Sequence, residues 1–156
     1  MFLESIDAAR AAETPAPLVI RQRLARFEPA FAVATIGQQV RFTNEDGIYH
    51  GVFSYSPPNQ FEQRPFPPGH SRVVEFKHPG LVAIYSPLHA GMRGKILVVP
   101  DPRYAIPDAR GEFKIVAVPA GRYRLFVWTE RHGESARELS LTAGEVARAD
   151  FTLGPR

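Results

Sequence analysis

The sequence predicts an all-β fold, and two observations carry that prediction. The 156 residues include 15 prolines and 12 glycines, which interrupt helices and suit many short strands. Between these breaks, apolar residues recur in steps of two, the spacing of a strand with one buried face. Only residues 3–12 have helical character. We therefore expect β-sandwiches, in which two sheets bury their apolar faces against each other.

Compact apolar runs predict the strands of the first hundred residues. The run FAVAT places Phe31, Val33 and Thr35 on one face. Residues 54–69, rich in proline and aromatic residues, predict a long irregular loop that covers a sandwich edge. The other predicted strands in this part are QVRF (39–42), VVEF (73–76), LVAIYS (81–86) and GKILVV (94–99).

A proline-rich connection predicts two modules. Residues 99–108, VPDPRYAIPD, contain three prolines in ten residues and form a stiff link. We place the modules at residues 15–100 and 101–156, the second a small β-sandwich that is short enough to depend on the first for stability. In it, GEFKIVAV (111–118) and YRLFVW (123–128) predict two strands around a Pro-Ala-Gly turn, and residues 137–153 predict a terminal hairpin.

Composition excludes several classes of function. The net charge is only +3, from 19 basic and 16 acidic residues, without the basic cluster that nucleic-acid binding needs. No apolar run approaches the roughly 20 residues of a membrane span. The absence of cysteine excludes disulfides, thiolate ligands and thiol catalysis. The N-terminal residues lack the basic start and apolar core of a signal peptide.

Two segments contain residue types that suit a metal site. Residues 42–56, FTNEDGIYHGVFSYS, end one strand, form a polar turn and bring His50 into the next strand. The loop between two later strands carries Ser86, His89 and Met92. We expect both segments at the same end of the first sandwich, with the side chains close enough to share one ion.

These segments resemble the cupredoxin-like proteins of the plastocyanin-like or methylamine-utilisation type. In that family, a single-copper sandwich precedes a carboxypeptidase-regulatory-like β module. The family has an asparagine and an aspartate in a turn before a histidine, which correspond here to Asn44, Asp46 and His50. The resemblance covers roughly residues 18–153, and its three stretches follow the family's order: residues 41–57, 66–99 and 111–128.

The later loop departs from the family at one position. The family's loop reads cysteine, two residues, histidine, two residues, methionine; this chain has Ser86, His89 and Met92 there. The resemblance therefore implies a cupredoxin-like Greek-key sandwich with a copper site of His50, His89 and Met92, and Ser86 at the cysteine position. It also implies an exported, periplasmic protein for copper storage, delivery or sensing, and a periplasmic protein as a possible partner.

The missing thiolate changes the expected chemistry. A blue copper site depends on the copper–thiolate bond, so we do not expect a blue electron carrier. Two imidazoles and a thioether suit Cu(I), and they could also hold Cu(II) if Ser86 or water completes the ligand sphere. Zinc is a poorer match unless Glu45 or Asp46 supplies a carboxylate.

A metal-free interpretation stands beside this one. A chain that lost its cysteine could have lost its metal and kept the sandwich as an interaction scaffold, because fold does not fix function. A hydrolase is not indicated: Ser86 and His89 have neither a Gly-x-Ser-x-Gly elbow nor an obvious orienting acid. The sequence thus predicts a protein that is not an enzyme, with copper or no cofactor.

Overall fold

The computed structural model describes residues 1–6 and 15–154. Its regular secondary structure there is entirely β, which confirms the predicted all-β class. The described residues accordingly include no helix long and apolar enough to cross a membrane. The chain divides into two compact units at Pro100–Asp101, and the N-terminal strand belongs with the later residues. We call them the large unit (residues 15–100) and the small unit (residues 1–6 and 101–154).

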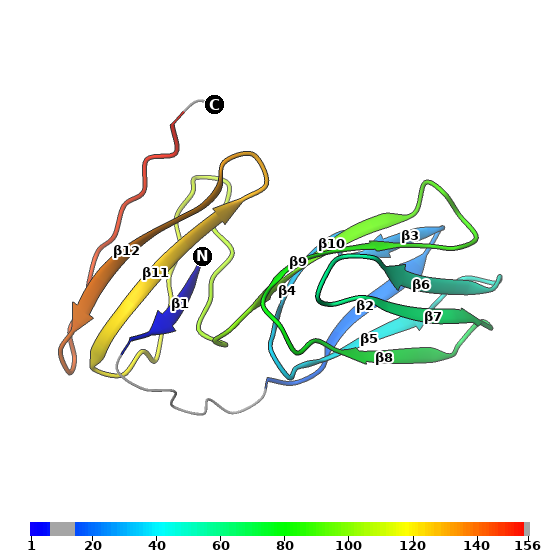
Figure 1. The fold of residues 1–156 in the computed structure, drawn as a ribbon, viewed down its shortest axis with the longest axis horizontal. Coiled ribbons are helices and arrows are strands. Elements are labelled where there is room, and N and C mark those ends of the chain that lie inside the picture. The colour runs from blue at the N-terminus through cyan, green and yellow to red at the C-terminus, as the bar shows by residue number, and fades with distance from the viewer. Residues whose placement is uncertain (7–14, 155–156) are drawn as a thin grey trace. The chain divides into compact units, whose positions relative to one another are not determined.

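The large unit is a sandwich of two sheets (Figure 1). Strands β4 and β10 pair in parallel in one sheet, β2 and β5 pair in parallel in the other, and the remaining pairs are antiparallel. The five-stranded sheet has the order β4 (Phe31–Thr35), β10 (Arg93–Val99), β9 (Gly80–Tyr85), β6 (His50–Ser54) and β7 (Phe61–Phe66). The four-stranded sheet has the order β3 (Arg26–Glu28), β2 (Leu18–Arg23), β5 (Gln39–Asn44) and β8 (Ser71–Glu75).

Alternating side chains fill the space between the two sheets. In β5, Val40, Phe42 and Asn44 are buried while the residues between them are more exposed, as a strand with one inner face requires. Phe42 and Phe66, one from each sheet, are fully buried. Truncating such a phenylalanine to alanine costs about 3–5 kcal/mol. This core fixes the register of the strands that carry the candidate site.

The predicted irregular loop at residues 54–69 is wrong in its second half. Phe61–Phe66 form β7, which pairs with β6 at the edge of the sheet. Pro65 argued against a strand in the sequence, because proline cannot donate a backbone hydrogen bond. An edge strand tolerates proline because one side of its backbone has no partner strand. Phe66 is the apolar residue that anchors β7 in the core.

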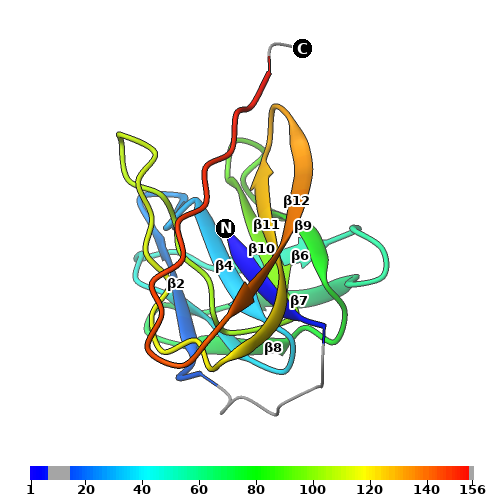
Figure 2. The same ribbon diagram turned by 90° about the vertical axis from the view of Figure 1, so that its left-hand side faces the viewer.

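The small unit contains one three-stranded sheet among the described residues. Its order is β1 (Phe2–Ser5), β11 (Gly121–Thr129), β12 (Gly133–Leu141), all antiparallel (Figures 1 and 2). The predicted helical character of residues 3–12 is wrong for residues 3–5, because pairing with β11 makes them strand; residues 7–12 lie outside the described part.

Two predicted strand segments of the small unit are also wrong. Residues 111–118 and 146–153 form no strand, because their side chains pack on a face of the sheet rather than pairing at its edges. Several of their apolar side chains are nevertheless partly buried. Phe113, Ile115 and Phe151 pack against the cluster of Leu3, Tyr123 and Leu125 on the sheet. Chain without regular secondary structure, rather than a second sheet, therefore covers this face.

Candidate metal centre

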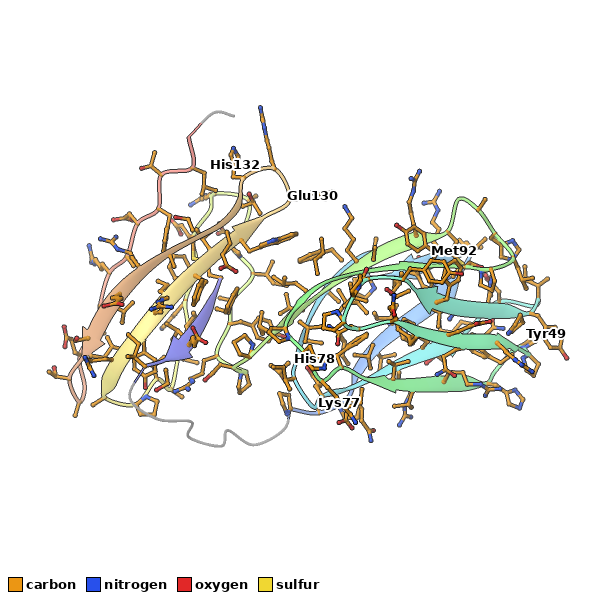
Figure 3. All side chains as sticks on the ribbon, in the orientation of Figure 1. Tyr49, Lys77, His78, Met92, Glu130 and His132 are labelled. Carbon is orange, nitrogen blue, oxygen red and sulfur yellow. The ribbon has the colours of Figure 1, made fainter. Side chains whose placement is uncertain are left out.

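The strand directions bring three connecting segments to one end of the large unit. β2, β5 and β9 finish there, and β3, β6 and β10 begin there, because each connects to the next strand at that end. In Figure 3, Tyr49 and Met92 lie toward this end, whereas Lys77 and His78 lie toward the opposite end. We call this end the loop end. It holds all four residues that the sequence proposes as a site.

His50 opens β6 and is completely buried. Its Nε2 lies 2.7 Å from Oδ2 of Asp46. Because an ionised carboxylate only accepts hydrogen bonds, Nε2 carries the hydrogen in this pair and Nδ1 of the neutral ring keeps a free lone pair. Nδ1 is buried and has no hydrogen-bond partner. A buried imidazole nitrogen with an unused lone pair is what a metal ion requires of histidine.

Asp46 ties His50 to the turn between β2 and β3. The backbone N–H groups of Leu24 and Ala25 donate to the Asp46 carboxylate, at 2.6 and 2.9 Å. Both turn residues have positive φ, 51° and 52°, a conformation that side chains other than glycine adopt at a cost. Burial alone would raise the pKa of Asp46, but the hydrogen bonds from Ala25, His50 and Leu24 outweigh it and lower that pKa.

Ser86 shapes the loop between β9 and β10. Its backbone N–H donates to the Met92 carbonyl at 3.1 Å, and the Met92 N–H donates to the His89 carbonyl at 2.9 Å. The Ser86 hydroxyl oxygen accepts from the N–H groups of Leu88 and His89, both at 3.2 Å. These two bonds occupy the lone pairs of Oγ. The hydroxyl is therefore a poor metal donor, and its interactions support the turn instead.

The His89 ring lies against the His50 ring, and Met92 is buried at the same end of the large unit (Figure 3). The imidazole rings of His50 and His89 have centroids 4.9 Å apart and planes inclined by 64°. Nε2 of His89 is buried and has no hydrogen-bond partner. Met92 is only 1% exposed and packs in the core cluster. Two imidazole nitrogens without protein partners, with a buried thioether at the same end of the sandwich, are donor types that fit a copper ion.

Carboxylates offer no alternative ligand set at this place. The described residues include no cluster of three or more His, Cys, Asp or Glu side chains that could hold a metal ion. Glu45 pairs with Arg21 at 3.1 Å, and Asp46 already accepts three hydrogen bonds. A metal ion here would rely on the sulfur of Met92 as its third side-chain donor. Such a set favours Cu(I) over zinc.

Gly51 lets the loop approach β6 and β7 closely. A Cβ at this position would lie 2.9 Å from Cγ of Pro87 and 2.9 Å from the Gln63 carbonyl oxygen. We expect Gly51→Ala to lower the free energy of unfolding by about 1–3 kcal/mol, because the backbone must shift to relieve both contacts. Gly47→Ala is the matched control, since a Cβ there would meet nothing within 4 Å. Chemical denaturation measures both, and equal stabilities would contradict the prediction.

Sequence reasoning missed two contributors at the loop end. It considered Asp46 as a possible zinc ligand, whereas the structure makes it the acceptor for His50 and the β2–β3 turn. It did not notice Gln22, a fully buried amide in β2. A signal for Gln22 was present: it follows Leu18 and Ile20 at the inward-facing spacing of the strand, where an apolar residue is expected.

The protein is similar to known proteins in structure but not in sequence. No known protein family and no curated protein matches the sequence. Among solved structures, the chain is similar to a Cu-containing nitrite reductase from Thermus scotoductus SA-01, at 21% identity and a TM-score of 0.53. This similarity covers 63% of the present chain and 26% of the reductase, so the chain spans about a quarter of that protein's length.

Variants of amicyanin are also similar in structure. A reduced variant matches at 18% identity and a TM-score of 0.51, covering 58% of this chain and 88% of amicyanin. A Cu(I) variant matches at 16% identity and a TM-score of 0.51, covering 53% and 82%. Identities this low concern the fold alone. Together with the two-sheet sandwich, these similarities show that the chain has a cupredoxin-like fold.

Proposed function

We propose that the protein binds one copper ion at His50, His89 and Met92 and serves in copper storage, delivery or sensing. The observation that carries this proposal is the pair of buried imidazole nitrogens, Nδ1 of His50 and Nε2 of His89, that lack any hydrogen-bond partner. A buried polar atom without a partner costs about 1–3 kcal/mol. Occupation by a metal ion would remove that cost at both rings.

The ligand set of two imidazoles and a thioether favours a copper-binding role over electron transfer or catalysis. Copper would supply redox and Lewis-acid chemistry at such a site, while the protein residues hold it and exclude water. Without a thiolate, the site lacks the ligand on which a blue electron carrier depends. The Ser86 hydroxyl oxygen accepts hydrogen bonds from two backbone N–H groups. A serine nucleophile also needs an adjacent base to activate it. A binding role, rather than electron transfer or catalysis, suits this set.

The setting of this function is part of the same proposal. The fold is one that a Cu-containing nitrite reductase and amicyanin also have. By resemblance to exported cupredoxin-like proteins, we place the protein in the periplasm or another exported location. Its partners there would be the metal ion and a protein that gives or receives it.

Copper titration of the metal-free protein tests the proposal. We expect one Cu(I) per chain, followed anaerobically against a competing chromophoric chelator, and a weaker 1:1 complex with Cu(II). His50→Ala and His89→Ala should each weaken Cu(I) binding by about 100-fold or more, since loss of a ligand exceeds the 10–100-fold typical of an outer residue. His78→Ala, an exposed histidine toward the opposite end, should leave the affinity unchanged.

The same titration decides against the proposal if the protein takes up neither ion. It also does so if the His78→Ala variant loses as much affinity as the His50→Ala variant. The chain would then be a metal-free scaffold with a cupredoxin-like sandwich.

A further inference from the structure

Gln22 is a buried side chain whose hydrogen-bonding capacity is unused. It is 0% exposed, and neither Oε1 nor Nε2 has a hydrogen-bond partner. Native proteins pair the great majority of buried amides, because an unpaired one costs free energy. Among the described residues, the buried side-chain N and O atoms without a partner belong to Gln22, His50 and His89 alone. Two of these three residues are the imidazoles of the candidate metal centre.

The sheet register places Gln22 at the loop end. Gln22 is paired with Asn44 across the parallel β2–β5 ladder. The Asn44 amide donates to the carbonyl of Phe66, and Phe66 is paired with His50 in the opposite sheet. Gln22 and Asn44 both point into the sandwich, as their burial in alternating strands requires. The chain thus brings Gln22 to the same end of the sandwich as His50, in the opposite sheet and pointing inward.

A second connection reaches the same place along the backbone. Two residues after Gln22, the turn at Leu24 and Ala25 donates to Asp46, and Asp46 accepts from His50. The end of β2 is therefore fixed to the histidine through one carboxylate.

We propose that Gln22 is a further ligand of this site and that its amide oxygen supplies the oxygen donor that Ser86 cannot. This deepens the proposed function and rests on it. The side chain offers a carbonyl oxygen with two lone pairs, and no protein group competes for it. Oxygen and imidazole nitrogen favour Cu(II), whereas a thioether favours Cu(I). Gln22 is then the residue that allows this pocket to hold the oxidised ion.

Gln22→Leu tests the assignment by two measurements: the stability without metal should stay the same or rise, and the Cu(II) affinity should fall. Without metal, the variant should be as stable as the wild type or melt about 2–4 °C higher, because an unpaired amide is exchanged for an apolar side chain of similar size. With metal, Cu(II) affinity should fall tenfold or more while Cu(I) affinity changes little. A tenfold loss for Cu(II) alone raises the Cu(II)/Cu(I) potential by about 59 mV.

Gln38→Leu is the matched control. Gln38 is also buried, but its Oε1 accepts from the Thr35 N–H and its Nε2 donates to the Ala16 carbonyl. That variant should be less stable and should bind both ions as the wild type does. If Gln22→Leu does not fold, Gln22→Val, an apolar side chain that suits a strand and offers no donor atom, takes its place in the same measurements.

The outcomes separate this inference from the function on which it rests. If the wild type binds copper and the Gln22 variant binds Cu(II) equally well, Gln22 is no ligand and only this inference fails. If the Gln22 variant is destabilised without metal as the Gln38 variant is, the amide has a structural role and the inference also fails. If the wild type binds neither ion, both proposals fall together.

Discussion

Replacing Ser86 with cysteine should turn the Cu(II)-loaded protein intensely blue or green, whereas the wild type stays nearly colourless. The colour of such sites comes from the copper–thiolate bond, which the wild-type chain cannot form. Ser86 is 7% exposed, so the new sulfur would be shielded from water. The N–H groups of Leu88 and His89, which now donate to the serine oxygen, would donate to the thiolate instead.

Visible absorption of the Cu(II)-loaded variants measures this effect. His89→Ala in the Ser86→Cys background should abolish the colour, because one imidazole would be missing. Ser54→Cys is the matched control: Ser54 is also buried in this sandwich, but it lies four residues along β6 from His50, about 13 Å away. That variant should stay colourless. A folded Ser86→Cys protein that takes up Cu(II) without the thiolate band would show that the ligands are not assembled around a common ion.

Replacing Asp46 with alanine should lower the free energy of unfolding by about 2–4 kcal/mol and weaken copper binding by about 10–100-fold. The carboxylate accepts from Leu24, Ala25 and His50, and the His50 ring is fully buried. Its loss would leave that Nε2–H without an acceptor and free the ring to rotate. The two strained turn residues would also lose the acceptor that holds their backbone.

Two variants and one pH series isolate the cause. Asp46→Asn keeps the size of the side chain but removes the charge and one acceptor, so an intermediate loss is expected. Glu45→Ala removes a neighbouring surface carboxylate paired with Arg21 and should change stability by less than about 1 kcal/mol. Chemical denaturation at neutral pH measures all three. Asp46→Ala within the range of Glu45→Ala would contradict the assigned role.

The sign of the pH dependence follows from the lowered pKa of Asp46. A carboxyl whose folded-state pKa lies below its unfolded value stabilises the protein at pH values above the unfolded pKa. That contribution disappears as the pH falls from about 4 through the folded-state pKa. The stability difference between wild type and Asp46→Asn should therefore shrink in acid. A difference that stays constant down to pH 2 would mean that the charge of Asp46 is not the source.

Much of the large unit follows from local sequence. The period-two runs at residues 31–35 and 39–42 and the compact apolar runs at 81–86 and 94–99 predict strands, and β4, β5, β9 and β10 are found there. Apolar runs and alternation are local properties that the sequence displays directly. In β5 every second side chain is buried, whereas most of β4 and β10 is buried on both faces. The spacing of Ser86, His89 and Met92 likewise belongs to one short loop whose backbone hydrogen bonds are internal.

Pairing across long distances in the chain was decided only by the tertiary structure. Phe2–Ser5 become strand because they pair with β11, while residues 111–118 and 146–153 pack on a face of the sheet and form no strand. A strand exists only with a partner, and a sequence window does not contain the partner.

The candidate site shows the same division between local and tertiary causes. The sequence by itself determined which side chains could bind a metal: His50, His89 and Met92. The Leu24–Ala25 turn contains no glycine or asparagine from which the sequence would predict it. It is held by the Asp46 carboxylate, 21 and 22 residues away in the chain. Gln22 became a candidate only when the fold buried its amide without a partner. Such an orphaned group arises from packing between sheets, which no spacing of residues along the chain encodes.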